Sequence, residues 1–204
     1  MIGKLDNIEP RVVTVIGAGV AGTQSISKAL DNNAFVKVLD TKKSKLQKLE
    51  SEFGSNNIEY ILSTSDSVQS AINESDMVIG SVYVVGKEAP KVVFKDMLKS
   101  MNPGTVMVDV SIDQGGCFET SRPTTHDNPT FVENDIVHYC VTNMPGAVPL
   151  TATQALNKVT LKYIEDLANK GVENALTEDE HLRNGLNIQN GEITHPAVRD
   201  ALNN

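Results

Sequence analysis

One aspartate stands where a buried strand is predicted to end. The stretch VDVSIDQGGCFETSRP, residues 108–123, runs from apolar residues to Asp113 and then to Gly115 and Gly116. A carboxylate at a strand end can orient a hydroxyl, a water or an ammonium group, and glycines let backbone come close to a ligand. Asp113 is therefore our candidate catalytic residue, with a role as a loop cap as the alternative.

A glycine-rich turn gives the second candidate site. VIGAGVAG, residues 15–22, places Gly17, Gly19 and Gly22 in a G-x-G-x-x-G pattern. In that pattern the first glycine permits a tight turn, the second lets backbone approach a pyrophosphate, and the third lets a helix pack closely on its strand. The N-terminus of the helix would offer free N–H donors and partial positive charge to the phosphates.

Asp40 follows Gly22 by eighteen residues, at the predicted end of the next strand. An acid about 20 residues after the glycines is expected to accept hydrogen bonds from the adenosine ribose. Because a 2′-phosphate would meet like charge at Asp40, we expect NAD as the cofactor, although Lys42 and Lys43 leave NADP open.

Apolar strands alternate with amphipathic helices along the first 143 residues. We expect strands over 12–16, 35–40, 58–63, 76–84, 105–112 and 136–143, and helices over 23–34, 41–53, 66–75, 95–101 and 151–171. Residues 113–135 are expected to form a long polar loop. Parallel neighbours need a crossover between them. The pattern therefore predicts a doubly wound, mainly parallel Rossmann sheet of the α/β class over residues 1–143, with a helical C-terminal segment over residues 144–204.

Other candidates have ordinary structural explanations. Ser63, Val82 and Val110 lie near predicted strand ends, where α/β sheets hold ligands, but a serine there can cap a helix and valines can complete a core. Lys45 can equally be a solvated helix residue. We expect none of the histidines to be the general base, those being His126, His138, His181 and His195.

Composition narrows the functional class. The formal net charge is −8 and the lysines form no basic stripe, so we expect no nucleic-acid partner. No apolar run approaches the roughly 18 residues of a spanning helix, so we expect no membrane segment. The two cysteines, Cys117 and Cys140, lie in no CxxC or His/Cys cluster, so we expect reduced thiols, no metal site and a cytoplasmic location.

Several stretches together resemble the C-terminal half of bacterial L-alanine dehydrogenase. They include VIGAGVAG, DMVIGSV, SIDQGGCFETSRPTTHDNPTF, HYCVTNMPGAVPLTATQALNKVTL and GLNIQNGEIT. The resemblance covers the chain from about residue 11 onward, and the DQGG and NMPGAVP motifs are much more specific than the glycine pattern. The related proton-translocating transhydrogenases match these motifs less well.

The resemblance implies NAD-dependent interconversion of L-alanine with pyruvate and ammonia by hydride transfer. It implies that Asp113 is the catalytic aspartate beside the nicotinamide ribose. It also implies cofactor contacts with the pyrophosphate at Gly17, Gly19, Val20 and Ala21, with the adenosine end at Asp40, Lys45 and Ser63, and with the nicotinamide end at Val82, Val110, Val141, Asn143 and Met144.

The resemblance also implies that part of the active site is missing from this chain. In the family a substrate domain precedes the glycine pattern and supplies an arginine, a lysine and a histidine, whereas here sixteen residues precede Gly17. We expect residues 144–204 to be the remnant of that domain, and their exposed apolar face to favour a homo-oligomer.

Three interpretations follow. The chain is a dehydrogenase portion that needs a substrate-domain partner, an NAD(H)-binding module or sensor without turnover, or an interaction protein that uses its helical tail.

Overall fold

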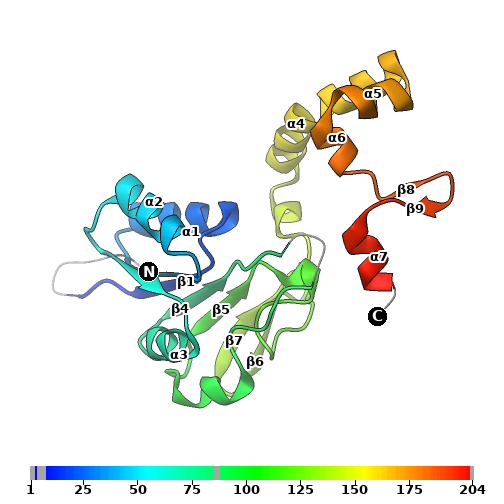
Figure 1. Ribbon diagram of the computed structural model, residues 1–204. Coiled ribbons are helices and arrows are strands. Elements are labelled where there is room, and N and C mark those ends of the chain that lie inside the picture. Colours follow the sequence, from blue (N-terminus) through cyan, green and yellow to red (C-terminus); the bar gives the residue numbers. More distant parts are fainter. Residues whose placement is uncertain (1–2, 4–7, 85–87, 203–204) are drawn as a thin grey trace. The chain divides into compact units, whose positions relative to one another are not determined.

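The computed structural model describes residue 3, residues 8–84 and residues 88–202. The chain divides into two compact units, one ending at Asn143 and one beginning at Met144. Figure 1 shows a sheet with its helices in the first unit, blue to green, and mainly helices in the second, yellow to red. Of the expected segments 1–143 and 144–204, residues 1–2, 4–7, 85–87 and 203–204 lie outside the described residues.

The first unit contains a seven-stranded sheet with the order β3-β2-β1-β4-β5-β7-β6. Neighbouring strands are parallel from β3 to β7, and β6 pairs antiparallel with β7. The expected doubly wound, mainly parallel sheet is confirmed. The strands are β1 (Val12–Ile16), β2 (Phe35–Asp40), β3 (Ile58–Leu62), β4 (Met77–Gly80), β5 (Val106–Asp109), β6 (Thr130–Glu133) and β7 (Ile136–Tyr139).

Helices cover both faces of the sheet. On one face α1 (Val20–Asp31) and α2 (Lys43–Phe53) pack Ile26 and Leu46 against the valines of β1 and β2. On the other face α3 (Ser65–Asn73) and the 3₁₀ helix η1 (Lys95–Ser100) pack against Leu39, Met107 and Phe118. This double coverage explains why β1 and β2 are buried almost throughout, as expected of parallel strands.

Several expectations near the candidate site are wrong. The strands expected over 76–84 and 136–143 end earlier, at Gly80 and Tyr139. The strand expected over 105–112 ends at Asp109, and Asp113 lies beyond it in the 3₁₀ turn η2 (Ile112–Gln114). The segment expected to be a long polar loop contains β6, which pairs with β7 across a tight turn at Asn134 and Asp135. Both turn residues have positive φ, as a two-residue hairpin requires.

The second unit is helical except for one short hairpin. The 3₁₀ helix η3 (Met144–Ala147) precedes α4 (Pro149–Lys170), which is capped at Gly171 with φ 78° as expected. Then follow α5 (Val172–Glu178), α6 (Glu180–Asn184), β8 (Ile188–Gln189), β9 (Glu192–Ile193) and α7 (Pro196–Leu202). The expectation of a purely helical segment is wrong at β8 and β9, because Asn190 and Gly191 form a hairpin turn with positive φ at both residues.

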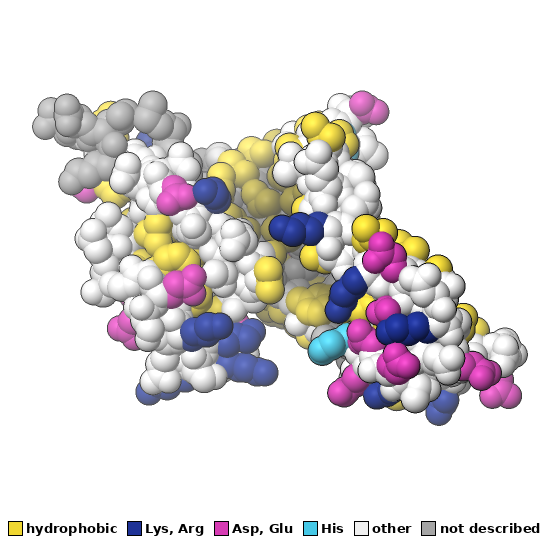
Figure 2. Space-filling view, turned by 90° about the horizontal axis from the view of Figure 1, so that it is seen from above, with side chains coloured by type: hydrophobic (Ala, Val, Ile, Leu, Met, Phe, Trp, Pro, Cys, Tyr) yellow, Lys and Arg dark blue, Asp and Glu magenta, His cyan; other side chains and the backbone are white. Residues whose placement is uncertain are grey.

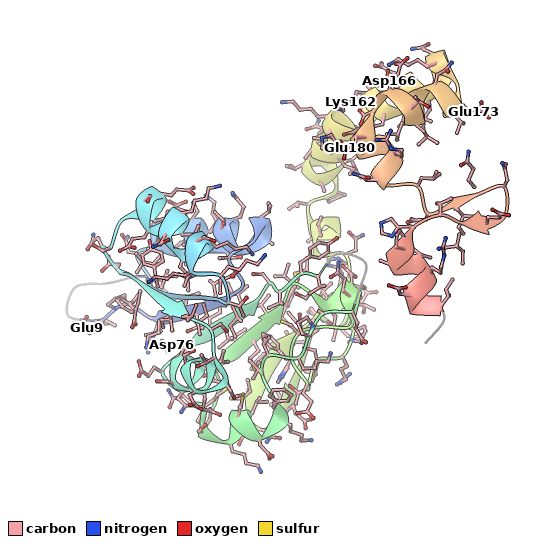
Figure 3. All side chains as sticks on the ribbon, viewed as in Figure 1. Glu9, Asp76, Lys162, Asp166, Glu173 and Glu180 are labelled. Carbon is pink, nitrogen blue, oxygen red and sulfur yellow. The ribbon has the colours of Figure 1, made fainter. Side chains whose placement is uncertain are left out.

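Ion pairs connect the helices of the second unit. Lys162 of α4 contacts Asp179 before α6, and Lys170 of α4 contacts Glu178 of α5 as well as Asp166 of its own helix. Figure 3 labels Lys162 and Asp166 on α4. Asp179 also caps α6 by accepting a hydrogen bond from the backbone N–H of Leu182. In the part of the chain that the structure describes, no helix is long and apolar enough to cross a membrane.

Candidate functional site

The glycine pattern forms a strand–turn–helix junction between β1 and α1. Gly17 has φ 107°, and its N–H donates to the carbonyl of Leu39 at 2.8 Å. A side chain at Gly22 would collide with the carbonyl oxygen of Gly17, so the fold itself requires both of these glycines.

Gly19 differs from the other two glycines. Its φ of −87° suits any residue, and a Cβ atom there would meet nothing within 4 Å. Packing within the chain therefore gives no reason for a glycine at this position, whereas the close approach of a ligand does. Gly19 is the N-cap of α1, and the first turn of α1 has neither a side-chain cap nor an acidic residue. The N–H donors in the first turn of α1 are therefore available to bind an anion, and Val20 beside them is 88% exposed.

Asp40 ties the end of β2 to this turn. Its Oδ2 accepts hydrogen bonds from the backbone N–H of Ala18 at 2.9 Å and from Lys45 Nζ at 3.2 Å, and its Oδ1 accepts one from the backbone N–H of Lys42 at 2.8 Å. The N–H of Ser63 donates to the Asp40 carbonyl. The structure thus brings together Asp40, Lys45 and Ser63, the three residues that the resemblance implies for the adenosine end.

The pKa of Asp40 follows from these contacts. Burial alone would raise the pKa, because a buried carboxylate loses its hydration. The two backbone N–H donors and the ammonium of Lys45 outweigh burial and hold the pKa below its ordinary value. Asp40 is therefore negatively charged at neutral pH, which suits ribose hydroxyls and disfavours a phosphate.

Hydrogen bonds join the ends of β1, β4 and β5. The hydroxyl of Ser81 donates to the carbonyl of Gly17 at 2.9 Å, and the N–H of Val110 donates to the carbonyl of Gly80 at 2.8 Å. The hydroxyl of Ser111 donates to the carbonyl of Val82 at 2.8 Å. Val82 and Val110, two candidates for the nicotinamide end, therefore lie at adjoining strand ends.

The three remaining candidates for the nicotinamide end, Val141, Asn143 and Met144, have different surroundings. Val141 is fully buried after β7, which is compatible with a purely structural role. Asn143 has φ 52°, and its carbonyl accepts a hydrogen bond from Nε2 of His126. Met144 begins the second unit.

Asp113 is exposed on the loop that follows β5. Gly115 and Gly116 after it have φ of 85° and 74°, so the turn itself requires glycine at both positions. The segment before η1 pairs with this loop, since Ala89 N donates to the carbonyl of Gln114 and Val92 N to that of Cys117. Asp113 is thus presented to solvent by a loop that is itself well hydrogen-bonded.

Sequence reasoning missed Asp109. It is fully buried at the end of β5, and its carboxylate accepts hydrogen bonds from backbone and hydroxyl donors of residues 111–121. The available signal was a carboxylate inside the apolar run VMVDV, because charged residues are almost never fully buried without partners.

Burial keeps the two thiols and the buried histidine in their neutral forms. Burial raises the pKa of Cys117 and of Cys140, and the nearby Asp109 adds to both effects, so both stay protonated. Burial lowers the pKa of His138, which stacks on Phe131 and lies within hydrogen-bond distance of the Thr120 hydroxyl. Among the described residues, no three His, Cys, Asp or Glu side chains gather as metal ligands.

A groove of about 380 Å³ lies elsewhere, beside α1. Its lining is partly apolar and contains none of the candidate cofactor residues: Val13, Gln24, Ser25, Lys28, Ala29, Asn32, Met77 and Ile79. The hydrogen-bonding groups described above lie at the carboxyl ends of the strands instead, where open α/β sheets bind ligands.

Residues 1–196 match the family model described as "Alanine dehydrogenase/PNT, C-terminal domain". The chain is 48% identical over 201 residues to alanine dehydrogenase of Halomonas elongata, covering 98% of this chain and 54% of that protein.

Solved structures agree with the sequence comparison. An L-alanine dehydrogenase matches with TM-score 0.90 and 43% identity, covering 99% of this chain and 55% of its own. A transhydrogenase from Sinorhizobium meliloti matches with TM-score 0.73 and 25% identity, covering 93% and 51%. The chain thus spans about half the length of the relatives it matches.

The charge of Asp40 predicts a pH dependence of stability. Because its pKa is lower in the folded chain, Asp40 stabilises the fold above its unfolded pKa of about 4, and this contribution is lost as the pH falls through the folded value. Urea unfolding from pH 7 to pH 2.5 should show Asp40→Asn with a smaller loss of unfolding free energy than wild type. Asp31→Asn is an exposed control, whose one ion pair among the described residues is with Lys28, and it should follow wild type. Identical pH profiles for Asp40→Asn and wild type would contradict the assignment.

Proposed function

The chain belongs to the alanine dehydrogenase/PNT family and contains its C-terminal domain, and from this premise we propose that it is the NAD(H)-binding portion of an alanine dehydrogenase-like oxidoreductase. The cofactor lies along the carboxyl ends of β2, β1, β4 and β5. In the complete enzyme, L-alanine, NAD⁺ and water give pyruvate, ammonium, NADH and a proton.

One observation carries the proposal, namely the open space at Gly19 above the uncapped N-terminus of α1. The pyrophosphate binds there, on backbone N–H groups from Gly17 to Ala21, because helix N-termini stabilise anions. No net positive charge on the protein is needed, which agrees with its formal charge of −8.

Asp40 determines the choice between the two nicotinamide cofactors. Its carboxylate has acceptor capacity for the ribose hydroxyls of the adenosine, with Lys45 and Ser63 beside it. A 2′-phosphate would lie against this charge, and Lys45, which is already paired with Asp40, does not offset it. Lys42 contacts Asp40 through its backbone N–H, and among the described residues no ion pair joins Lys42 or Lys43 to Asp40. NAD is therefore the expected cofactor, in keeping with the family.

Cofactor titration tests this site. The pure chain should bind NADH and discriminate against NADPH in calorimetry or fluorescence titration. Asp40→Ala should weaken NADH binding about tenfold or more, since a hydrogen bond to a charged group is lost, and should reduce the discrimination. Asp31→Ala, on the same face of the sheet but at the far end of α1, should bind as wild type. Absence of NADH binding at millimolar concentration would contradict the proposal.

Asp113 is the proposed catalytic residue. It lies on the loop after β5, near Val82 and Val110, where the nicotinamide end of the cofactor binds. NAD⁺ supplies the hydride acceptor, and the carboxylate of Asp113 orients the nicotinamide ribose or the attacking water and holds a proton. Hydride transfer also requires the substrate to be fixed in near-attack geometry. The family resemblance implies that the groups that fix it lie in the N-terminal part of the substrate domain, and the chain matches only 54% of the Halomonas elongata relative.

Activity measurements separate the enzyme from a binding module without turnover. The pure chain should produce little or no NADH from L-alanine and NAD⁺. Mixed or co-expressed with the N-terminal half of the Halomonas elongata relative, it should turn over, and Asp113→Asn should then lose about 100-fold or more in rate. Asp127→Asn is the control. Steady turnover by the chain alone would contradict the incomplete site, and full activity of Asp113→Asn would contradict its role.

Self-association is proposed from the surface of α4. This helix has no buried residue, and Figure 2 shows apolar side chains open to solvent on the molecular surface. The exposed apolar residues of α4 are Leu150, Leu156, Val159, Leu161 and Ile164. Apolar surface of this kind favours a homo-oligomer.

The buried free cysteines support a reducing, cytoplasmic location.

Sedimentation velocity tests the oligomer. The wild-type chain should sediment as a larger species as its concentration rises, and Leu156→Glu with Val159→Glu should shift it toward monomer while NADH binding stays unchanged. The control Lys158→Glu changes charge on the same helix without removing apolar surface. A monomer at every concentration would contradict self-association.

A further inference from the structure

Asp109 is surrounded by hydrogen-bond donors. Its Oδ2 accepts from the backbone N–H of Cys117 at 2.8 Å, the backbone N–H of Phe118 at 3.2 Å and the hydroxyl of Ser121 at 2.6 Å. Its Oδ1 accepts from the backbone N–H of Ser111 at 3.0 Å, and the thiol of Cys117 lies 3.5 Å away. Every one of these neighbours can donate, which matches the acceptor-only inventory of a carboxylate.

Burying the carboxylate of Asp109 costs hydration free energy, which the hydrogen bonds from the loop must offset. The Asp109 side chain is 0% exposed, and among the described residues no cation pairs with it. A buried carboxylate without a cation is tolerated only when hydrogen bonds replace its hydration. All of the donors come from residues 111–121, so the carboxylate gathers both ends of the loop that carries Asp113.

The contacts continue from Asp109 to the proposed nicotinamide end. Asp109 holds the N–H of Ser111, the hydroxyl of Ser111 holds the carbonyl of Val82, and Asp113 lies two residues farther along the loop. The amine of Lys91 braces the outer side of the loop by donating to the carbonyls of Gly115 and Gly116 at 2.5 and 2.7 Å.

The backbone at Gly116 packs closely against the carboxylate of Asp109. A Cβ atom at Gly116 would lie 2.8 Å from Oδ2 of Asp109, so the backbone of the DQGG motif rests directly on this carboxylate. A change in the Asp109 side chain must therefore move the loop backbone. The glycine turn near Gly17 and the Asp40 contacts lie at other strand ends and share no hydrogen bond with Asp109 among those of the described residues.

We propose that Asp109 is a positioning residue that holds the 110–116 loop in the conformation that receives the nicotinamide half of NAD(H). The inference rests on the proposed function and assigns this task to a residue that touches neither cofactor nor substrate. Asp109 acts through Ser111 and Gly116, and its effect is confined to the nicotinamide half. The adenosine half depends on Asp40 and on the N-terminus of α1.

The test compares two ligands that share the adenosine half. NADH and ADP-ribose are titrated separately into the full 204-residue chain. In Asp109→Asn an amide N–H₂ replaces one acceptor oxygen, which leaves at least one loop N–H without a partner. NADH affinity should fall about tenfold, whereas ADP-ribose affinity should change by less than about twofold.

Two further variants keep the test decisive. Ser121→Ala removes one donor and retains the carboxylate, so it should fold even if Asp109→Asn does not, and should weaken NADH alone by about threefold. Asp76→Asn is the matched control, because Asp76 also accepts a backbone N–H, that of Val12 at 2.9 Å, but lies just before β4, away from the loop (Figure 3). It should leave both affinities unchanged.

The outcomes distinguish this inference from the proposed function. A wild-type chain that binds neither ligand overturns both. A wild-type chain that binds both ligands, with variants that weaken NADH and ADP-ribose equally or weaken neither, overturns only the role of Asp109. Selective loss of NADH in Asp109→Asn and Ser121→Ala supports it.

Discussion

Two buried carboxylates hold the loops that follow the strands of this sheet. Parallel strands leave backbone N–H groups unpaired where the chain departs from the ladder, and such groups need partners when they are buried. At the end of β2, Asp40 accepts the N–H groups of Ala18 and Lys42, and at the end of β5, Asp109 accepts those of Ser111, Cys117 and Phe118. Each loop is thereby shaped before any ligand binds, and a preshaped site loses less freedom on binding.

The two carboxylates have different surroundings and therefore different uses. Asp40 has an ammonium partner and open space beside the glycine turn, so it can exchange contacts with a ligand. Asp109 is enclosed by its own loop and has no room for a ligand, which restricts it to holding the backbone. Asp113, four residues later, is exposed. The short stretch VDVSID thus contains an enclosed carboxylate, Asp109, and an exposed one, Asp113, which we propose as the catalytic residue.

Much of the candidate site around the glycine turn could be predicted from the sequence, because short-range geometry governs the order of its elements. The order strand, glycine turn, helix, strand and acid is set by short-range geometry, and the structure has it at Val12–Asp40. The loop after β5 could not be predicted in the same way. The apolar pattern of VMVDVSI predicts one continuous strand. The strand ends at Asp109 because the chain folds back and residues 117–121 donate hydrogen bonds to the Asp109 carboxylate, which the local sequence does not reveal. The strand β6 was missed because its polar, exposed edge carries little apolar alternation.

A crystal structure of the chain with NAD bound would show directly where each part of the cofactor lies. We expect the pyrophosphate on the N–H groups between Gly17 and Ala21, the adenosine ribose on Asp40, and the nicotinamide against the loop that carries Asp113, with the Asp109 hydrogen bonds unchanged. Cofactor bound instead in the groove beside α1, or with its nicotinamide directed away from the 110–116 loop, would contradict this expectation.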